Sequence, residues 1–394
     1  MTLVYICLFA ASIVIIATFA VLLFGIAKRH FLVQDFIRSS NKMLLPQRCL
    51  LIRPCSGDEE YLVKCLTSIS QAKHDFHIDI VFGVDDIQDS AMPAIRKATS
   101  DLSAIGYKTS FTIADITGAN RKASIIDSCI KQYQGEYDVV IVADSNIDLT
   151  GFDLNKMLAF LMSSQILASV WVPFFEKAEH VELGNKASEA VLHFSWHSFG
   201  LLSCIDKQSM VGKLFALKRE AVNAIDGFGA LSNYLGEDME LCRRLAKQGY
   251  NVKSIPLSVM SPCSTKTWKQ ALDRHVRWMT VVKAQRPLLM TSYPLLFFNS
   301  LIVYAISIIC AVFHFPAAAA IFATALVLRF AVGYVAAQML NLKHSKLELI
   351  KSIFLADTLI AVAFVKTIFT KKIIWRGKTL IIGGRGNVEN YRTN

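Results

Sequence analysis

The sequence lacks the short motifs that mark several large classes of enzyme. It contains neither the G-x-G-x-x-G fingerprint of dinucleotide-binding folds nor the G-x-x-x-x-G-K-[ST] phosphate loop. Its nine cysteines form no C-x-x-C pair and are odd in number, so we expect free thiols in a reducing compartment and no zinc site. No internal repeat and no low-complexity segment is present. Dinucleotide, phosphate-loop and zinc enzymes therefore have no specific support.

Charge is missing from the start of this 394-residue chain. Residues 3–27 contain no charged residue and no proline, and at about 1.5 Å per residue they can cross a hydrocarbon core of about 30 Å. Only Met1 and Thr2 precede them, so the cationic leader of a cleaved signal peptide is missing. Residues 1–30 are therefore expected to form a retained transmembrane anchor.

A second long stretch, residues 288–340, contains no acidic residue and is broken near Pro316. It is long enough for two spans, and it predicts a transmembrane hairpin in residues 287–342. Arg329 lies within this hairpin. A charge at such depth marks a functional site by default, whereas a snorkelling or carbonyl-paired arginine is the simpler interpretation.

Cations next to the apolar stretches predict how the chain is oriented. Lys28, Arg29 and His30 follow the first stretch directly, and Lys343 and Lys346 follow the second. The positive-inside rule puts these groups in the cytosol and the N-terminus outside. We therefore expect an integral membrane protein with a cytosolic catalytic domain, in a bacterial inner membrane or a Golgi or endoplasmic reticulum membrane. The residues numbered 31–47 are predicted to be a linker or an interface helix.

The last part of the chain, residues 343–394, combines an apolar segment with a basic tail. Lys351, Asp357 and Lys366 interrupt the apolar residues of 347–369, which favours an interfacial or re-entrant helix over a further span. Ten Lys and Arg stand against three Asp and Glu here, in a chain whose net charge is +11. Beside a membrane, this surplus fits anionic lipid headgroups as partners better than nucleic acid.

Between the apolar stretches, the pattern predicts an α/β domain in residues 48–286. Short apolar runs alternate there with helix-like stretches, which is typical of a largely parallel sheet. The predicted strands are 49–54, 77–84, 109–114 and 137–143.

Acidic residues follow two of these strands. Asp86 and Asp89 come after the second strand, and Asp144 follows the fourth. The carboxyl ends of parallel strands line the ligand crevice of an open sheet. Carboxylates there can accept from a nucleobase or a ribose, or can hold a hard divalent cation. Each cluster by itself is also compatible with solvated loop carboxylates, but together they favour a nucleotide site.

Two later motifs are ambiguous when each is taken alone. Glu237 and Asp238 open a strongly helical stretch, where they are either ordinary first-turn acids or a crevice carboxylate that acts as a general base. Arg274, Arg277 and Trp278 precede the apolar hairpin. Two forked cations and an indole suit a diphosphate beside a membrane, although a basic helix flank is common at such places.

Taken in chain order, five motifs resemble the signature of the family 2-like glycosyltransferases of GT-A fold. They are Val84-Asp-Asp-Ile-Gln-Asp89, Asn120-Arg-Lys122, Val142-Ala-Asp-Ser-Asn146, Gly236-Glu-Asp238 and Arg274-His-Val-Arg-Trp278. Within these, the chain looks most like the ceramide glucosyltransferase group of families 2 and 21, with bacterial homologues and hopanoid-associated enzymes as relatives. The resemblance covers roughly residues 45–290 and implies an α/β GT-A fold with membrane helices at both ends.

The resemblance implies a role for each motif. Its donor-binding residues would be Asp86, Asp89, Lys122, Asp144, Gly212 and Glu237. Its catalytic residues would be Asp238 as general base, with Arg274, Arg277 and Trp278 at the diphosphate. A divalent cation, Mg²⁺ or Mn²⁺, would be held by Asp144 and Asn146. His197 falls where ceramide-type enzymes carry a histidine, although a lone histidine between helical aromatics is more simply structural.

The implied reaction is an inverting transfer of a hexose from a UDP-sugar, most simply UDP-glucose, to ceramide, giving glucosylceramide. A hopanoid, diacylglycerol or polyprenyl acceptor stays open, as does a non-catalytic UDP-sugar-binding scaffold. Two departures from the family pattern matter. Asn146 replaces the second carboxylate of D-x-D, which weakens the metal inference. The last motif begins with Arg274 instead of glutamine, and the spans are too few for an obvious polymer channel.

Overall fold

The computed structural model describes residues 2–393, except 43, 180–181, 196–204, 206–208, 313–314, 371, 376–377 and 384–385. His197 lies outside the described residues, as does Cys204. The other cysteines are free thiols. The chain forms two compact units, of which the first comprises Met1–His30, His180–Ile205 and Thr265–Ile373. The second comprises Phe31–Glu179, Asp206–Ser264 and Ile374–Asn394.

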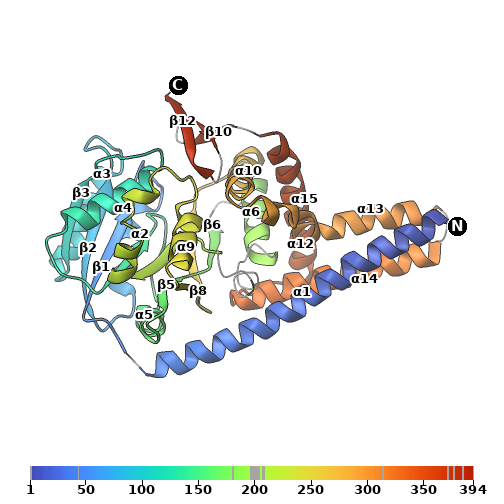
Figure 1. Ribbon diagram of the computed structural model, residues 1–394, viewed down its shortest axis with the longest axis horizontal. Coiled ribbons are helices and arrows are strands. Elements are labelled where there is room, and N and C mark those ends of the chain that lie inside the picture. The colour runs from blue at the N-terminus through green and yellow to red at the C-terminus, as the bar shows by residue number, and fades with distance from the viewer. Residues whose placement is uncertain are drawn as a thin grey trace. The chain divides into compact units, whose positions relative to one another are not determined.

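The second unit is built on a seven-stranded sheet in the order β3-β2-β1-β4-β7-β5-β8 (Figure 1). Strands β1, β2, β3 and β4 are mutually parallel, as are β5 and β8, whereas β7 runs antiparallel to β4 and β5. The four strands predicted from the sequence are all present. The strands are β1 (Arg48–Pro54), β2 (His77–Val84), β3 (Lys108–Ile113), β4 (Val139–Ala143), β5 (Leu167–Trp171), β7 (Leu214–Lys218) and β8 (Asn251–Ser254).

Apolar runs without alternation explain why the central strands are inside. Every residue of β4 is buried, as expected of a parallel strand that is covered on both faces. The covering helices include α3 (Met92–Ala104), α4 (Arg121–Gln132), α5 (Leu154–Met162) and α9 (Glu237–Lys247). Shorter elements are α2 (Leu62–Thr67), η1 (Ser68–Gln71), α8 (Arg219–Ala224) and η3 (Gly229–Leu231), the pair β6 (Phe174–Ala178) and β9 (Val259–Cys263), and the C-terminal strands β10 (Lys372–Trp375), β11 (Lys378–Ile382) and β12 (Val388–Thr393).

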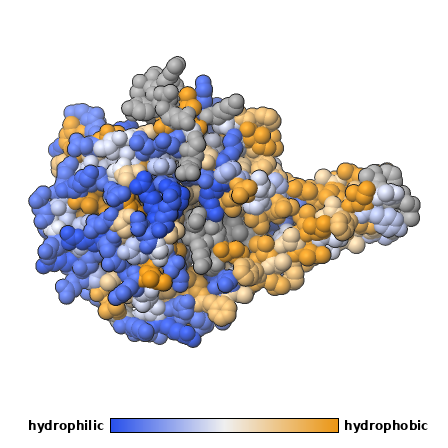
Figure 2. Space-filling model, viewed as in Figure 1, coloured by the Kyte–Doolittle hydropathy of each residue, from blue (hydrophilic) through white to orange (hydrophobic). Residues whose placement is uncertain are grey.

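The first unit consists of helices. It holds most of α1 (Thr2–Asn41), together with α6 (Leu183–Phe194), α10 (Trp268–Gln285), α11 (Pro287–Thr291), α12 (Tyr293–Phe297), α13 (Asn299–Ala311), α14 (Phe315–Met339) and α15 (Lys346–Phe369). Helix α6 packs against α10, α14 and α15 in one apolar core. Helices α1, α13 and α14 share a second cluster, and hydrophobic side chains cover their surface (Figure 2).

Three described helices, α1, α14 and α15, are long and apolar enough to cross a membrane. Helix α13 is shorter, so the two arms of the predicted hairpin differ in length. The length and composition of these helices fit a membrane protein. The predicted domain boundaries and the interfacial placement of residues 347–369 stay predictions.

Arg329 and Asp357 form a buried ion pair in this unit. The Nη2 atom of Arg329 lies 2.7 Å from Oδ1 of Asp357, and its Nη1 donates to the Phe194 carbonyl over 2.8 Å. The Ser300 hydroxyl donates to the same carboxylate. The carbonyl-paired interpretation of Arg329 is thus observed, with a carboxylate partner that the sequence pattern did not indicate. Because Asp357 is paired, its charge no longer argues against a membrane span in α15.

Candidate active site

The chain leaves β4 at Asp144, and both oxygens of this carboxylate are paired with lysines. Lys122 Nζ lies 2.7 Å from Oδ1, and Lys213 Nζ lies 3.1 Å from Oδ2. Lys213 Nζ also donates to Asn146 Oδ1 over 2.8 Å. Although burial acts to raise it, the two ammonium groups hold the pKa of Asp144 below its ordinary value. Asp144 is therefore ionised at neutral pH.

Lys122 joins the two acidic motifs. It is the second residue of α4, whose N-cap is Asn120, and this places its ammonium beside Asp144. The ammonium also lies 3.2 Å from Glu237 Oε1 and donates to the Gly212 carbonyl over 2.5 Å. Although burial opposes it, the carboxylates of Asp144 and Glu237 raise the pKa of Lys122. The cation is therefore permanent and links β4 to the start of α9.

Gly212 lies against Asp238 in a space that admits no larger residue without adjustment. A Cβ atom at this position would meet both Asp238 Cβ and Lys122 Nζ at 3.3 Å. The Gly212 N–H donates to Asp238 Oδ2 over 3.0 Å, and the Met239 N–H donates to Oδ1 over 2.8 Å. Gly212 thus holds one carboxylate oxygen of Asp238, while Met239 of α9 holds the other.

Asp238 has the electrostatics of a general base. Burial and the neighbouring charge of Glu237 raise the pKa of Asp238 to about 6, against the opposing effects of Lys122 and the two N–H donors. Asp238 is also in the first turn of α9, as the helix-start interpretation expects, and its role as a base stays a prediction. A carboxylate that is mostly ionised at neutral pH, yet basic for its type, suits proton abstraction.

The segment before Glu237 is held from two directions. The Asn120 side chain donates to Glu237 Oε2 and to the Tyr234 carbonyl, each over 2.8 Å. From the C-terminal end of the chain, the Val388 N–H donates to the Asn233 carbonyl over 2.8 Å. Sequence reasoning missed this second support, because backbone pairing between distant segments has no residue signature.

The acids after β2 have other partners. Asp89 Oδ1 accepts from the N–H groups of Gly57 and Ala91, over 2.7 and 2.8 Å, whereas Asp86 is exposed. Asp85 forms an ion pair with Arg121, directly before Lys122. The loop after β2 is therefore tied to the start of α4 through Asp85, which the sequence interpretation did not single out. Asp86 and Asp89 stay predicted donor contacts.

Arg274, Arg277 and Trp278 lie on α10, in the unit that contains the long apolar helices. Thr267 and Gln270 form a capping box that starts this helix. The guanidinium of Arg274 lies over the Trp278 ring at 4.3 Å from its centroid. The contribution of these three side chains to the diphosphate stays a prediction.

The side-chain oxygens of Asp144 and Asn146 are suitable ligands for the predicted divalent cation. It offers one carboxylate and one amide oxygen, both of the hard type that Mg²⁺ prefers. Among the described residues, no group of three or more His, Cys, Asp and Glu side chains is arranged to hold a metal ion. Mg²⁺ commonly binds through one or two carboxylates plus substrate phosphates. The residues therefore fit a cation that is held mainly by phosphate oxygens, and not one held by a complete protein cage.

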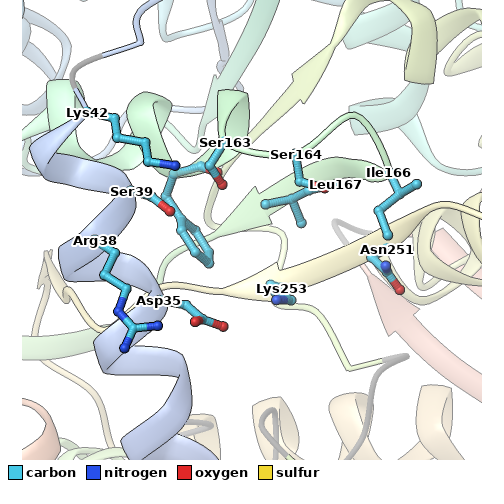
Figure 3. Close-up of a pocket in the computed structure, with 11 residues that line it drawn as sticks. Asp35, Arg38, Ser39, Lys42, Ser163, Ser164, Ile166, Leu167, Asn251 and Lys253 are labelled. Atoms are coloured by element: carbon cyan, nitrogen blue, oxygen red, sulfur yellow. The ribbon is translucent and has the colours of Figure 1, made fainter.

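A separate cavity of about 290 Å³ lies in the second unit, which also contains Asp144 and Asp238 (Figure 3). The end of α1 contributes Asp35 and Arg38 to its lining, Lys42 directly follows that helix, and β8 contributes Lys253. None of the predicted site residues lines it. This basic cavity is thus distinct from the cluster around Asp144 and Asp238.

Comparison with known proteins agrees with the motifs. The model of the family described as Glycosyl transferase family 21 matches residues 10–388. Ceramide glucosyltransferase 3 of Caenorhabditis elegans is 23% identical over 251 residues, which cover 62% of this chain and 52% of that protein. The chain thus spans about half the length of this curated relative. These matches confirm the resemblance and the glycosyltransferase class.

Solved structures that resemble the chain are distant. The mannosyltransferase PcManGT from Pyrobaculum calidifontis, in complex with GDP-Man and Mn²⁺, has 13% identity and a TM-score of 0.45. The match covers 90% of this chain and 99% of that one. GalNAc-T7 with UDP, GalNAc and Mn²⁺ has 13% identity and a TM-score of 0.42, over 62% of this chain and 51% of that one. Similarity at this distance carries no information about substrates.

Proposed function

Because the chain belongs to glycosyl transferase family 21, we propose that it transfers a hexose from a UDP-sugar to the hydroxyl group of a membrane lipid. The proposed donor is UDP-glucose, the acceptor is ceramide and the product is glucosylceramide. The observation that carries the proposal is the network in which Lys122 and Gly212 connect Asp144 to Glu237 and Asp238. The relation to a ceramide glucosyltransferase supports the choice of acceptor.

The proposed mechanism is a single inverting displacement. Asp238 takes the proton of the acceptor hydroxyl while that oxygen forms a bond to the anomeric carbon, and the bond from this carbon to the diphosphate oxygen breaks. Gly212 and Met239 orient the carboxylate by their N–H groups. The Lys122 ammonium contacts the carboxylates of Asp144 and Glu237, so it would offset charge that develops on a UDP departing beside them, a preorganised form of stabilisation.

The remaining predicted contacts complete the donor site in this proposal. Asp86 would bind the uracil or ribose, since it is exposed, whereas Asp89 already accepts from two backbone amides. A divalent cation, when bound with the donor, would be held by Asp144 and Asn146 and would add positive charge at the diphosphate. Arg274, Arg277 and Trp278 are proposed to bind the diphosphate next to the lipid acceptor.

The proposed location follows from the apolar helices and the adjoining cations. The α/β unit would lie in the cytosol, and the basic residues of 343–394 would contact anionic lipids of the same membrane leaflet. The membrane itself is a bacterial inner membrane, or that of the Golgi or endoplasmic reticulum.

Release of UDP tests the function directly. Purified full-length protein in detergent would be incubated with UDP-glucose or UDP-N-acetylglucosamine, with and without ceramide. Release that ceramide stimulates, with a glucosylated lipid seen by mass spectrometry, supports the proposal. Release stimulated only by a hopanoid, a diacylglycerol or a polyprenyl phosphate selects a different acceptor. No release under any condition indicates the non-catalytic scaffold.

The pH profile is expected to report Asp238. Below its pKa of about 6 the side chain is protonated and cannot take a proton, so kcat/KM should rise with pH through about 6 and then level off. Glu237→Gln removes the negative charge that helps to raise this pKa, so the acidic limb should move to lower pH. The measurement is kcat/KM for the acceptor between about pH 4.5 and about pH 8, a range that extends at least about 1.5 pH units on either side of that midpoint.

Asp101→Asn is the matched control, because Asp101 is a carboxylate on the exposed face of α3 that pairs with Lys97 four residues earlier. Its profile should coincide with that of the wild type. An acidic limb that stays in place in Glu237→Gln would show that Asp238 is not the group that titrates.

A further inference from the structure

Lys213 is a residue of the site that the proposed mechanism leaves without a role. Its ammonium contacts both predicted metal ligands, at 3.1 Å from Asp144 Oδ2 and 2.8 Å from Asn146 Oδ1. The backbone fixes this placement, since the Asp144 N–H donates to the Lys213 carbonyl over 2.8 Å. The ammonium thus lies where a cation bound to these two oxygens would have to lie.

The charges around Asp144 disfavour a free divalent cation. One carboxylate faces two ammonium groups, those of Lys122 and Lys213, and Asn146 contributes an oxygen without a charge. Like charges a few ångströms apart repel strongly in a partly buried site, because little water screens them. A bare Mg²⁺ or Mn²⁺ would therefore have to displace an ammonium without a replacement partner for it.

A nucleoside diphosphate changes this balance. Its phosphate oxygens supply negative charge and additional ligands for the cation, which is how Mg²⁺ is usually held. They also give a displaced ammonium new acceptors. Lys213 can make this exchange, because its four-carbon stem is flexible. Lys122 is less free, because it also bonds to Glu237 and to the Gly212 carbonyl.

We propose that the Lys213 ammonium occupies the predicted metal site until the divalent cation and a nucleoside diphosphate bind together. In the empty enzyme it binds Asp144 and Asn146, and on donor binding its ammonium moves to the diphosphate while the divalent cation takes its place. The cation consequently binds together with a nucleoside diphosphate and not before it. This inference rests on the proposed function, since it requires a UDP-sugar as donor.

Binding of Mn²⁺, followed by electron paramagnetic resonance with and without UDP, tests this inference on the full-length protein in detergent. The wild type should bind Mn²⁺ about 5- to 150-fold more tightly with UDP than without it, the range typical of coupling between two ligands. Lys213→Met should bind Mn²⁺ more tightly without UDP and so reduce this ratio toward one. Asn146→Asp, which adds a second carboxylate, should act in the same direction.

Lys247→Met is the matched control, because it removes the same charge from an exposed position at the end of α9. It should leave both Mn²⁺ affinities unchanged. Equal wild-type affinities with and without UDP overturn the inference, as does the absence of Mn²⁺ binding in both cases. An unchanged ratio in Lys213→Met also overturns it, and if that variant does not fold, Asn146→Asp decides by the same criterion.

Failure of this inference is distinguishable from failure of the proposed function. If the wild type binds UDP and glucosylates a lipid, but neither Lys213→Met nor Asn146→Asp changes the Mn²⁺ affinity, only the role of Lys213 is refuted. Protein that binds no UDP and modifies no lipid refutes the function itself.

Discussion

Asp238→Asn is expected to lower kcat by about 10²- to 10⁴-fold, the usual contribution of a positioned general base. The amide cannot take the proton of the acceptor hydroxyl. The Gly212 and Met239 N–H groups bond to different oxygens of Asp238, so the single amide oxygen can keep one of these two bonds. Because the amide has the same size as the carboxyl group, the surrounding fold should persist. Turnover would be followed by UDP release with the lipid acceptor, and donor affinity by calorimetry with UDP.

The comparison with donor binding makes this result specific. We expect the affinity for UDP to stay close to that of the wild type, because Asp238 acts on the acceptor in the proposed mechanism. Asp101→Asn, on the exposed face of α3, should leave both quantities unchanged. Normal turnover by Asp238→Asn would remove this residue from the role of base, whatever the fate of the other site residues.

Arg329→Met is expected to destabilise the protein by about 3–5 kcal/mol, because it leaves Asp357 buried without its partner. Asp357 is 1% exposed, and Arg329 donates three hydrogen bonds to its carboxylate and one to the Phe194 carbonyl. The network includes Ser300, so it connects α6, α13, α14 and α15. Unfolding in mixed detergent micelles, or the midpoint of thermal unfolding, would measure the change.

Two further variants separate the effect of burial from the effect of pairing. Lys366→Met removes an ion pair to Asp273 whose side chains are both 48% exposed, so its cost should be about 0–1 kcal/mol. The double variant Arg329→Met with Asp357→Leu should recover most of the lost stability, since no unpaired charge remains. A loss in Arg329→Met no larger than that in Lys366→Met would show that Asp357 reaches water or another partner.

Local sequence predicted four of the seven strands in the sheet of the α/β unit. The apolar run at 139–143 could only be a buried strand, and the acid that follows it had to lie at the carboxyl end of the sheet. The order of the five motifs then indicated the family. The long apolar stretches likewise predicted α1 and α14, because length and apolarity are properties that a single segment carries by itself.

Contacts between distant segments were outside the reach of such patterns. The antiparallel strand β7 places Lys213 against Asp144 and Asn146, and no spacing in the chain predicts this pair. Asp357 was interpreted as a reason to keep residues 347–369 out of the membrane, yet its carboxylate is buried against Arg329 of α14. Whether a buried charge destabilises the protein depends on its partner, and the partner of Asp357 lies on another helix.

The sequence by itself therefore determined the α/β sheet, the apolar helices and the identity of the acidic and basic groups of the site. Only the tertiary structure decided which of these groups are paired. The raised pKa of Asp238, about 6, and the contacts of Lys213 with both Asp144 and Asn146 follow from that pairing. The physical reason is that patterns of a few residues encode local conformation and burial, whereas the electrostatic state of a side chain depends on atoms that folding brings within a few ångströms.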